Sequence, residues 1–243
     1  DRGLLLPGEF IMVAEEMGAI IQLDRWVAEE ACKQLRIWHQ KYRSHKRATM
    51  SVNLSTTQLM RPDVVSGVDL ILRNSGLYGD SLKLEVTESV LMENAEYAQA
   101  VLEQLRKLKI AISIDDFGTG YSSLAYLRRF EIDTLKIDYS FVSRMLEDEE
   151  SSEIVRTIIT LAKNLGKDTV AEGVQTRSQF EALIEQGVNM VQGYFIAPPL
   201  PREVAESLLE RTAEQPNHMA KILSDRMQGF APEPESAQPN LAN

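Results

Sequence analysis

The sequence has little of several things that would point to particular classes of protein. Its 243 residues include one cysteine and three histidines, and no apolar run approaches the roughly 18 residues that a membrane-spanning helix needs. A lone Cys32 cannot form a disulfide within the chain, and no signal peptide opens the sequence. Both features suit a reducing compartment. We therefore expect a cytoplasmic domain, although its parent protein could carry a membrane anchor elsewhere.

An excess of positive charge is also missing. The chain has 26 basic and 36 acidic residues, which give a net charge of -10. Such a surface disfavours binding of a DNA or RNA polymer through a basic patch. An anionic substrate would need bound cations to make its site receptive. Because 44% of the residues are apolar, disorder is excluded for the body of the chain.

Short β-branched runs alternate along the chain with longer amphipathic segments, a pattern typical of a βα repeat with a parallel sheet. Few charges interrupt the short runs, as expected for strands that are buried on both faces. The sheet could be doubly wound or closed, and a spacing of roughly 25–30 residues per unit favours a TIM-like (β/α) barrel. The expected strands are Ala48–Leu54, Leu82–Val86, Ile110–Asp115, Thr134–Ile137, Thr169–Glu172 and Asn189–Gln192.

Local signals also predict helix boundaries. Thr176 and Gln179 have the spacing of a capping box, while Gly76, Gly166 and Gly187 are placed to end helices. One predicted apolar stripe consists of Leu23, Val27, Ala31, Leu35, Trp38 and Tyr42.

Six strands are fewer than the eight of a closed barrel. We expect that one or two N-terminal strands are missing, because only helical sequence precedes residue 48. The barrel domain is predicted over residues 1–211. Residues 212–243, which contain four prolines, are predicted to form a C-terminal extension with room for one short helix before a flexible tail.

Polar side chains gather where the predicted strands end. In a βα barrel these ends share one rim, where active sites are built. Hard oxygen donors without histidine or cysteine select Mg²⁺ or Mn²⁺ over zinc, and adjacent Asp115 and Asp116 could flank two ions. Lys136 adds a positive charge for a phosphate or a nucleophilic water. The residues at these ends are Asn53, Glu85, Glu88, Asp115, Asp116, Lys136, Asp138, Glu172 and Gln192.

Each of these residues has a purely structural interpretation as well. A single carboxylate at a strand end more often caps a helix, and Asn53 alone is typical of a turn. Lys136 could pair with Glu131 or Asp133. Gly118 and Gly120 alone mark a turn, because no dinucleotide or Walker fingerprint surrounds them. Six strands that all end in carboxylate, amide or lysine favour a functional rim.

Several of these segments carry a family resemblance. Between Leu4 and Leu209 the chain resembles the EAL domains, bacterial phosphodiesterases specific for cyclic di-GMP. The segments that match, in order, are Pro7-Gly8-Glu9-Phe10-Ile11, Ala14-Glu15-Glu16, Asn53-Leu54-Ser55, Glu85-Val86-Thr87-Glu88-Ser89, Asp115-Asp116-Phe117-Gly118-Thr119-Gly120, Leu135-Lys136-Ile137-Asp138, Ala171-Glu172-Gly173-Val174, Gln192-Gly193-Tyr194 and Pro199-Leu200.

The resemblance implies a fold, a reaction and a ligand set. The fold is a barrel with one antiparallel strand, and the reaction opens cyclic di-GMP to linear pGpG with two Mg²⁺ or Mn²⁺ ions. Lys136 and Glu172 are the implied catalytic residues. The implied ligands of the first ion are Asn53, Glu85 and Asp115, and those of the second are Asp115, Asp116 and Glu172.

The resemblance also implies supporting roles. Glu88 would anchor the loop of residues 116–123, which contains Gly118, Thr119 and Gly120 and which links the site to a homodimer interface in the family. Gln192, Asp138 and Gln175 would lie near the substrate or behind the ligands. Upstream sensory or cyclase domains are expected in the parent protein.

Two departures from the family matter. The Glu-Ala-Leu strand, whose glutamate is a metal ligand in the family, should lie before Asp1 and is not in the sequence. Gln175 stands where the family often has glutamate, so it can form hydrogen bonds but supplies no charge.

Three functions remain open. The first is a metal-dependent cyclic di-GMP phosphodiesterase, which the intact rim carboxylates and loop favour. The second is a degenerate domain that binds cyclic di-GMP as a receptor, and the third is a dimerising regulatory module. Whether this chain hydrolyses the dinucleotide without the upstream glutamate stays open.

Overall fold

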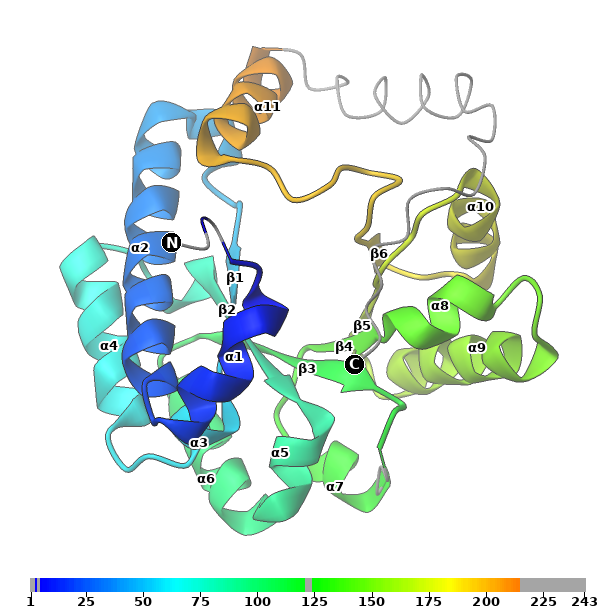
Figure 1. Cartoon of the computed structure of the whole chain (residues 1–243), viewed down its shortest axis with the longest axis horizontal. Helices are drawn as coiled ribbons and strands as arrows, with labels where there is room; N and C mark the ends of the chain where they lie inside the picture. Colours follow the sequence, from blue (N-terminus) through cyan, green and yellow to red (C-terminus); the bar gives the residue numbers. More distant parts are fainter. Residues whose placement is uncertain (1–2, 4, 121–123, 215–243) are drawn as a thin grey trace.

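A computed structural model describes residue 3 and residues 5–120 and 124–214 of the chain. Its core is one parallel six-stranded sheet in the order β1-β2-β3-β4-β5-β6. The sheet curls like half of a barrel, and helices cover its outer side (Figure 1). The strands are β1 (Met50–Asn53), β2 (Leu82–Thr87), β3 (Ala111–Phe117), β4 (Thr134–Ile137), β5 (Asp168–Ala171) and β6 (Met190–Val191).

The helices alternate with the strands along the chain. They are α1 (Pro7–Glu16), α2 (Ile20–Lys41), α3 (Thr56–Leu59), α4 (Val64–Ser75), α5 (Glu88–Glu93), α6 (Ala95–Lys107), α7 (Leu124–Arg129), α8 (Tyr139–Arg144), α9 (Glu149–Asn164), α10 (Arg177–Gln186) and α11 (Arg202–Glu214). Two short 3₁₀ helices are η1 (Arg43–His45) and η2 (Gly79–Ser81).

The predicted α/β barrel class and all six predicted strands are confirmed, with ends that differ by at most two residues. The capping box is present, since Thr176 accepts from Gln179 while the Gln179 side chain accepts in return. Gly76 and Gly187 end their helices with left-handed backbone. Among the described residues every strand pairing is parallel, so the antiparallel strand implied by the resemblance is not part of this sheet.

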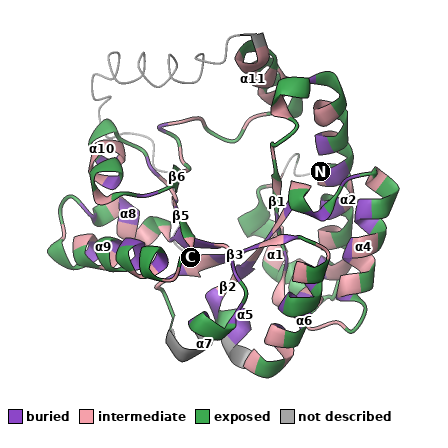
Figure 2. Cartoon of the chain, turned by 180° about the vertical axis from the view of Figure 1, so that it is seen from behind, coloured by how far each residue is buried: buried purple, intermediate pink, exposed green. Residues whose placement is uncertain are grey.

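The two faces of β2 differ in burial and polarity, which corrects the expectation that the strands are buried on both faces and carry few charges. Leu82, Leu84 and Val86 are buried, and the first two face α2 and α4. Side chains alternate along a strand, so the intervening Lys83, Glu85 and Thr87 face the concave side. The polar groups of the site therefore lie on the concave side, and Figure 2 shows that buried positions are found in the strands and on the helices that cover the sheet.

The predicted apolar stripe of α2 is wrong by one position for part of its length. The helix buries Ala28, Cys32 and Leu35, whereas Val27 is 40% exposed. Burial raises the pKa of the Cys32 thiol to about 11. Cys32 is therefore a small apolar core residue that stays protonated at neutral pH.

The chain beyond the sheet returns to the end of α2. Lys41 Nζ lies 2.7 Å from Glu206 Oε1 on α11, and His45 Nε2 lies 3.0 Å from the Leu209 carbonyl oxygen. The helix runs through Glu214, three residues into the predicted extension. The short helix and tail predicted farther on, and residues 121–123 of the predicted loop, lie outside the described residues. No helix in the described part is long and apolar enough to cross a membrane.

Candidate metal centre

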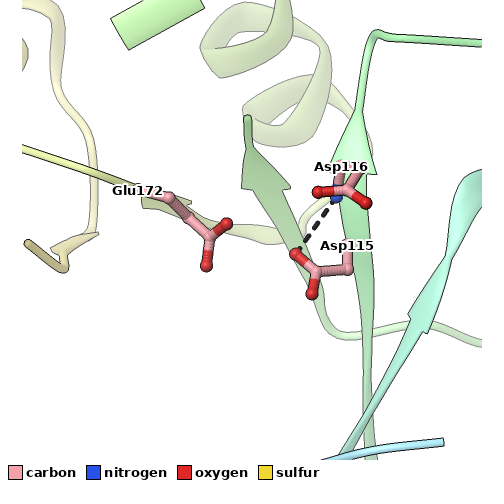
Figure 3. A group of neighbouring side chains, drawn as sticks. All are labelled: Asp115, Asp116 and Glu172. Atoms are coloured by element: carbon pink, nitrogen blue, oxygen red, sulfur yellow. Dashed lines mark hydrogen bonds between the residues drawn. The ribbon is translucent and has the colours of Figure 1, made fainter. Parts of the chain in front are cut away.

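A bulge in β3 places two consecutive carboxylates beside one another. The pairing of β3 with β4 shifts register between Ile114 and Phe117, and Asp116 has a φ of 53°. In a regular strand adjacent side chains point to opposite faces, whereas a bulge re-aims them. Aspartate tolerates left-handed backbone better than most residues do. The Asp116 amide donates to Asp115 Oδ1 at 3.1 Å, which fixes the pair (Figure 3).

Three carboxylate side chains form a cluster at the carboxyl ends of β3 and β5. They belong to Asp115, Asp116 and Glu172. One carboxylate oxygen from each residue lies within 4.8 Å of those from the other two. Figure 3 shows Glu172 and Asp115 pointing toward one another from neighbouring parts of the sheet. All donors are hard oxygen atoms, which fits a Mg²⁺ or Mn²⁺ ion and not a soft metal. These three are the residues predicted for the second ion.

Lys136 connects this group to Glu85. Its Nζ atom lies 2.6 Å from Glu85 Oε2, 2.7 Å from Glu172 Oε1 and 3.0 Å from Asp115 Oδ1. The lysine is 4% exposed, so these ion pairs are shielded from water. The alternative pairing of Lys136 with Glu131 or Asp133 is therefore wrong, since Asp133 instead accepts two bonds from Arg106.

Burial and close charges shift the pKa values in this cluster. For Lys136, burial alone would lower the pKa, but hydrogen bonds to Glu172 and Glu85 raise it overall, so the ammonium persists at neutral pH. Burial raises the pKa of Glu172 despite the opposing effect of Lys136. Burial also raises the pKa of Asp116, and the charges of Asp115 and Asp138 add to that shift. A bound cation would relieve the repulsion among these carboxylates.

Glu88 holds the loop that follows β3. It is 3% exposed, and its Oε2 atom accepts a hydrogen bond from the Gly118 amide at 3.0 Å. A Cβ atom on Gly120 would lie 3.4 Å from the Glu88 carboxyl group. Thr119 Oγ1 donates to the Asp116 carbonyl at 2.8 Å, which closes the turn. Glu88 therefore contacts the described part of the loop, and its anchoring role in the reaction stays a prediction. It is not one of the three clustered carboxylates Asp115, Asp116 and Glu172.

Gly173 lets the chain after Glu172 approach α8 closely. Its φ is 65°, and a Cβ atom there would lie 2.2 Å from Cδ2 of Tyr139. Any larger residue would push Tyr139 or the Glu172 backbone out of place. Glu172, a predicted metal ligand, is thus followed by a glycine whose close contact with Tyr139 helps to set the position of the glutamate.

The remaining predicted site residues lie around this centre with different surroundings. Asn53 is opposite Glu85 in the β1–β2 register, at the same edge of the sheet. Asp138 Oδ1 accepts from the Ser140 amide at 2.9 Å and so caps α8, as well as lying near Asp116. Gln192 pairs through its backbone with Ala171, and Gln175 precedes the cap of α10. Both glutamine side chains are exposed, and their roles stay predictions.

Comparison with protein families gives a match over most of the chain. The sequence model of the EAL domain matches residues 1–199.

The chain belongs to the EAL domain family.

Relatives of this EAL domain include two proteins of Pseudomonas aeruginosa. It is 42% identical over 213 residues to the bifunctional diguanylate cyclase/cyclic di-GMP phosphodiesterase MucR, covering 88% of this chain and 30% of MucR. It is 44% identical over 208 residues to the cyclic di-GMP phosphodiesterase NbdA, covering 86% of this chain and 26% of NbdA. The chain thus spans less than a third of the length of either relative.

The fold of the EAL domain agrees with these relatives. The solved structure of the PaMucR phosphodiesterase in complex with c-di-GMP matches with a TM-score of 0.82 and 41% identity. The match covers 84% of this chain and 82% of that one.

Sequence reasoning missed some polar residues on the concave face of this EAL domain. Lys83 Nζ donates to Thr134 Oγ1 at 3.2 Å, and Ser113 is fully buried opposite Glu85 in the β2–β3 register. Together they form a polar layer beneath Lys136. The alternation of Leu82, Lys83, Leu84 and Glu85 was the available signal, because period-two polarity marks a strand with one polar face.

Proposed function

We propose that this EAL domain hydrolyses cyclic di-GMP to linear pGpG and that it requires divalent Mg²⁺ or Mn²⁺ ions to do so. The observation that carries the proposal is the acidic cluster at the strand ends, where Glu85, Asp115 and Glu172 surround one buried ammonium and Asp116 lies beside them. The names of MucR and NbdA support the same substrate and reaction class.

The donor set divides naturally into two overlapping groups. Asp115, Asp116 and Glu172 would hold one ion, and Asn53, Glu85 and Asp115 would hold the other. Ions held by these residues would supply Lewis-acid activation of a water molecule and neutralisation of charge on the phosphate. Because the metal-free cluster is strongly acidic, it would repel a phosphodiester, so cations are also needed for binding.

The protein's own groups position the reactants and handle protons. Lys136 is held as an ammonium by three carboxylates, so it donates hydrogen bonds and cannot accept a proton in this arrangement. Its charge would orient the attacking water or a phosphate oxygen. Glu172 is the proposed proton acceptor, because it reaches the cluster from the end of β5 and lies 2.7 Å from Lys136 Nζ. The buried side chains beneath the cluster keep these groups from rearranging.

A direct assay tests the proposal. The purified chain is incubated with cyclic di-GMP and Mg²⁺ or Mn²⁺, and the products are separated by chromatography and identified by mass spectrometry. Linear pGpG that forms with wild type and not with Glu172→Gln is the expected result. Binding of cyclic di-GMP without any turnover would overturn the proposal in favour of the receptor alternative. The predicted homodimer is a separate question, which light scattering of the same sample answers.

A further inference from the structure

A basic hollow lies at the opposite end of the sheet from the metal centre. It has a volume of about 590 Å³. Its walls come from the last turns of α2 with η1, and from the connection between α4 and β2, both of which precede strands. We define the basic hollow by Arg36, His39, Arg43, Lys46, Tyr78 and Asp80.

The cations of the basic hollow stand out in an acidic protein. Arg36, Arg43 and Lys46 make no ion pair with any carboxylate in the part of the chain that the structure describes, whereas Lys41 nearby pairs with Glu206. Of the residues that the structure describes, Asp80 is the one acidic residue that lines the hollow. Three unpaired positive charges around one concavity therefore outweigh a single negative charge, which favours an anionic ligand.

Helix electrostatics explain only part of this clustering. Cations in the last turn of a helix interact favourably with its carboxyl-terminal dipole. Arg36 lies more than a turn before the end of α2 at Lys41, outside the range of that effect. Arg36 and His39 are three residues apart and so share one face of α2, whereas Arg43 reaches the same hollow from η1, after α2 has ended at Lys41.

The opposite wall of the basic hollow is held in place by packing. Leu77 is buried, and its amide donates to the Leu72 carbonyl at 3.2 Å. Gly79 lies so close to the Leu108 carbonyl oxygen that a Cβ atom would be 1.8 Å from it. Tyr78, between these two anchored residues, nevertheless exposes 81% of its surface. A rigid loop thus presents an aromatic ring at the edge of the hollow.

His39 adds a second polar group with a defined orientation. Its Nε2 atom lies 2.8 Å from the Ala48 carbonyl oxygen, which only accepts hydrogen bonds. Nε2 therefore carries the proton, and Nδ1 of a neutral ring is left as an acceptor.

We propose that the basic hollow binds a nucleoside polyphosphate. Arg36, Arg43 and Lys46 would contact the phosphate groups, since guanidinium groups match phosphate oxygens in a two-pronged geometry. The Tyr78 ring would stack on the base, as aromatic side chains do with nucleobases. The volume falls within the roughly 300–1,000 Å³ range of small-molecule sites. Asp80 and His39 Nδ1 are available to accept from sugar or base donors.

The test is calorimetric titration of the full chain with ATP, GTP, inorganic tripolyphosphate and adenosine in EDTA. Without divalent ions the acidic metal centre repels anions, so binding under this condition reports the basic hollow. The result is therefore separate from the hydrolysis assay. We expect ATP or GTP to bind, and each of Arg36→Ala and Arg43→Ala to weaken that binding about tenfold, the effect of losing one charge-assisted contact.

Two further variants assign the binding. Tyr78→Ala should weaken nucleotide binding and leave tripolyphosphate binding unchanged, while Lys163→Ala on α9 removes an exposed charge far along the chain and should change neither. Absence of binding in EDTA, or full affinity in the Arg36→Ala/Arg43→Ala variant, would overturn the proposal. Equal affinity for tripolyphosphate and nucleotides would overturn its nucleoside part. Circular dichroism melting of each variant verifies that it is folded.

Discussion

Lys136 Nζ on β4 and Glu85 Oε2 on β2 lie 2.6 Å apart, although β3 separates the two strands in the sheet. The contact crosses β3 on the concave side, and Asp115 from that strand joins it at 3.0 Å. The Lys136 ammonium therefore links β2, β3 and β4 at the place where the carboxylates of Glu85 and Asp115 would otherwise repel one another. The site and the stability of the metal-free protein depend on the same side chain.

Replacing Lys136 with methionine tests this dependence. In EDTA the free energy of unfolding should fall by about 3 kcal/mol, because removing one partner leaves buried carboxylates uncompensated. Added Mg²⁺ should raise the melting temperature of the variant more than that of wild type, since the ion replaces the missing charge. Turnover of cyclic di-GMP should drop about 100-fold or more. Lys163→Met is the matched control, and equal unfolding energies for Lys136→Met and wild type in EDTA would contradict the argument.

Alanine variants of Glu88 and Glu85 should distinguish a residue that anchors the loop from one that binds metal. Glu88→Ala removes the acceptor for the Gly118 amide, so the loop should shift and turnover fall by about 100-fold, as for other small misplacements of reacting groups. Its metal affinity should stay near that of wild type. Glu85→Ala should lower metal affinity by at least about tenfold. Calorimetric titration with Mn²⁺ compares the two, and equal loss of metal in both variants would show that Glu88 is a ligand.

The choice of cation should follow the hard oxygen donors. Mg²⁺ and Mn²⁺ should each support hydrolysis, whereas Ca²⁺ should bind without supporting it, because its larger radius and looser coordination do not hold an in-line arrangement. Chelation followed by addition of each ion, with pGpG measured by chromatography, gives the comparison. Turnover that survives exhaustive chelation would be incompatible with the proposed function.

Gly173 and Gly166 share the same left-handed backbone, but a side chain would collide with neighbouring atoms only at Gly173. Their φ angles are 65° and 66°, and no atom lies within 4 Å of a Cβ built on Gly166. Gly166→Ala should therefore cost about 1 kcal/mol for the left-handed backbone alone and keep full activity. Gly173→Ala adds the collision with Tyr139, so it should be less stable and should turn over more slowly because Glu172 moves.

A double variant measures that collision directly. Tyr139→Ala removes the ring that a Cβ on residue 173 would strike, so the Gly173→Ala/Tyr139→Ala pair should be more stable than the sum of the single changes predicts. Urea unfolding of the four proteins closes the cycle. Strict additivity would mean that the close approach of Gly173 to Tyr139 has no energetic consequence.

Local signals predicted most of the fold. The strands, the Thr176–Gln179 capping box and the ends of α4 and α10 each depend on residues within one turn or one strand. The buried face of α2 could not be predicted in the same way. Val27 and Ala28 fit an apolar stripe equally well, and only packing on β1 and α4 selects Ala28.

The site shows the same division between local and distant information. That Asp115 and Asp116 end a strand is visible in the sequence, but a regular strand would point them to opposite faces. The bulge that brings them together depends on how β4 pairs with β3. The links from Lys136 to Glu85 and Glu172 span 51 and 36 positions in the chain, so periodicity could suggest a shared rim without specifying these contacts.

The composition of the cluster around Lys136 also sets its charge balance. Fully ionised, its four carboxylates and single ammonium leave three net negative charges. One divalent ion would still leave the centre anionic, whereas two would give it one net positive charge. That charge is equal and opposite to the charge on one phosphodiester group, so the doubly loaded cluster would neutralise the one phosphodiester of cyclic di-GMP that is cleaved, and the second phosphodiester would keep its own negative charge. Because Lys136 contributes one positive charge, the cluster would become positively charged when the second ion binds, and only then would it attract a phosphodiester.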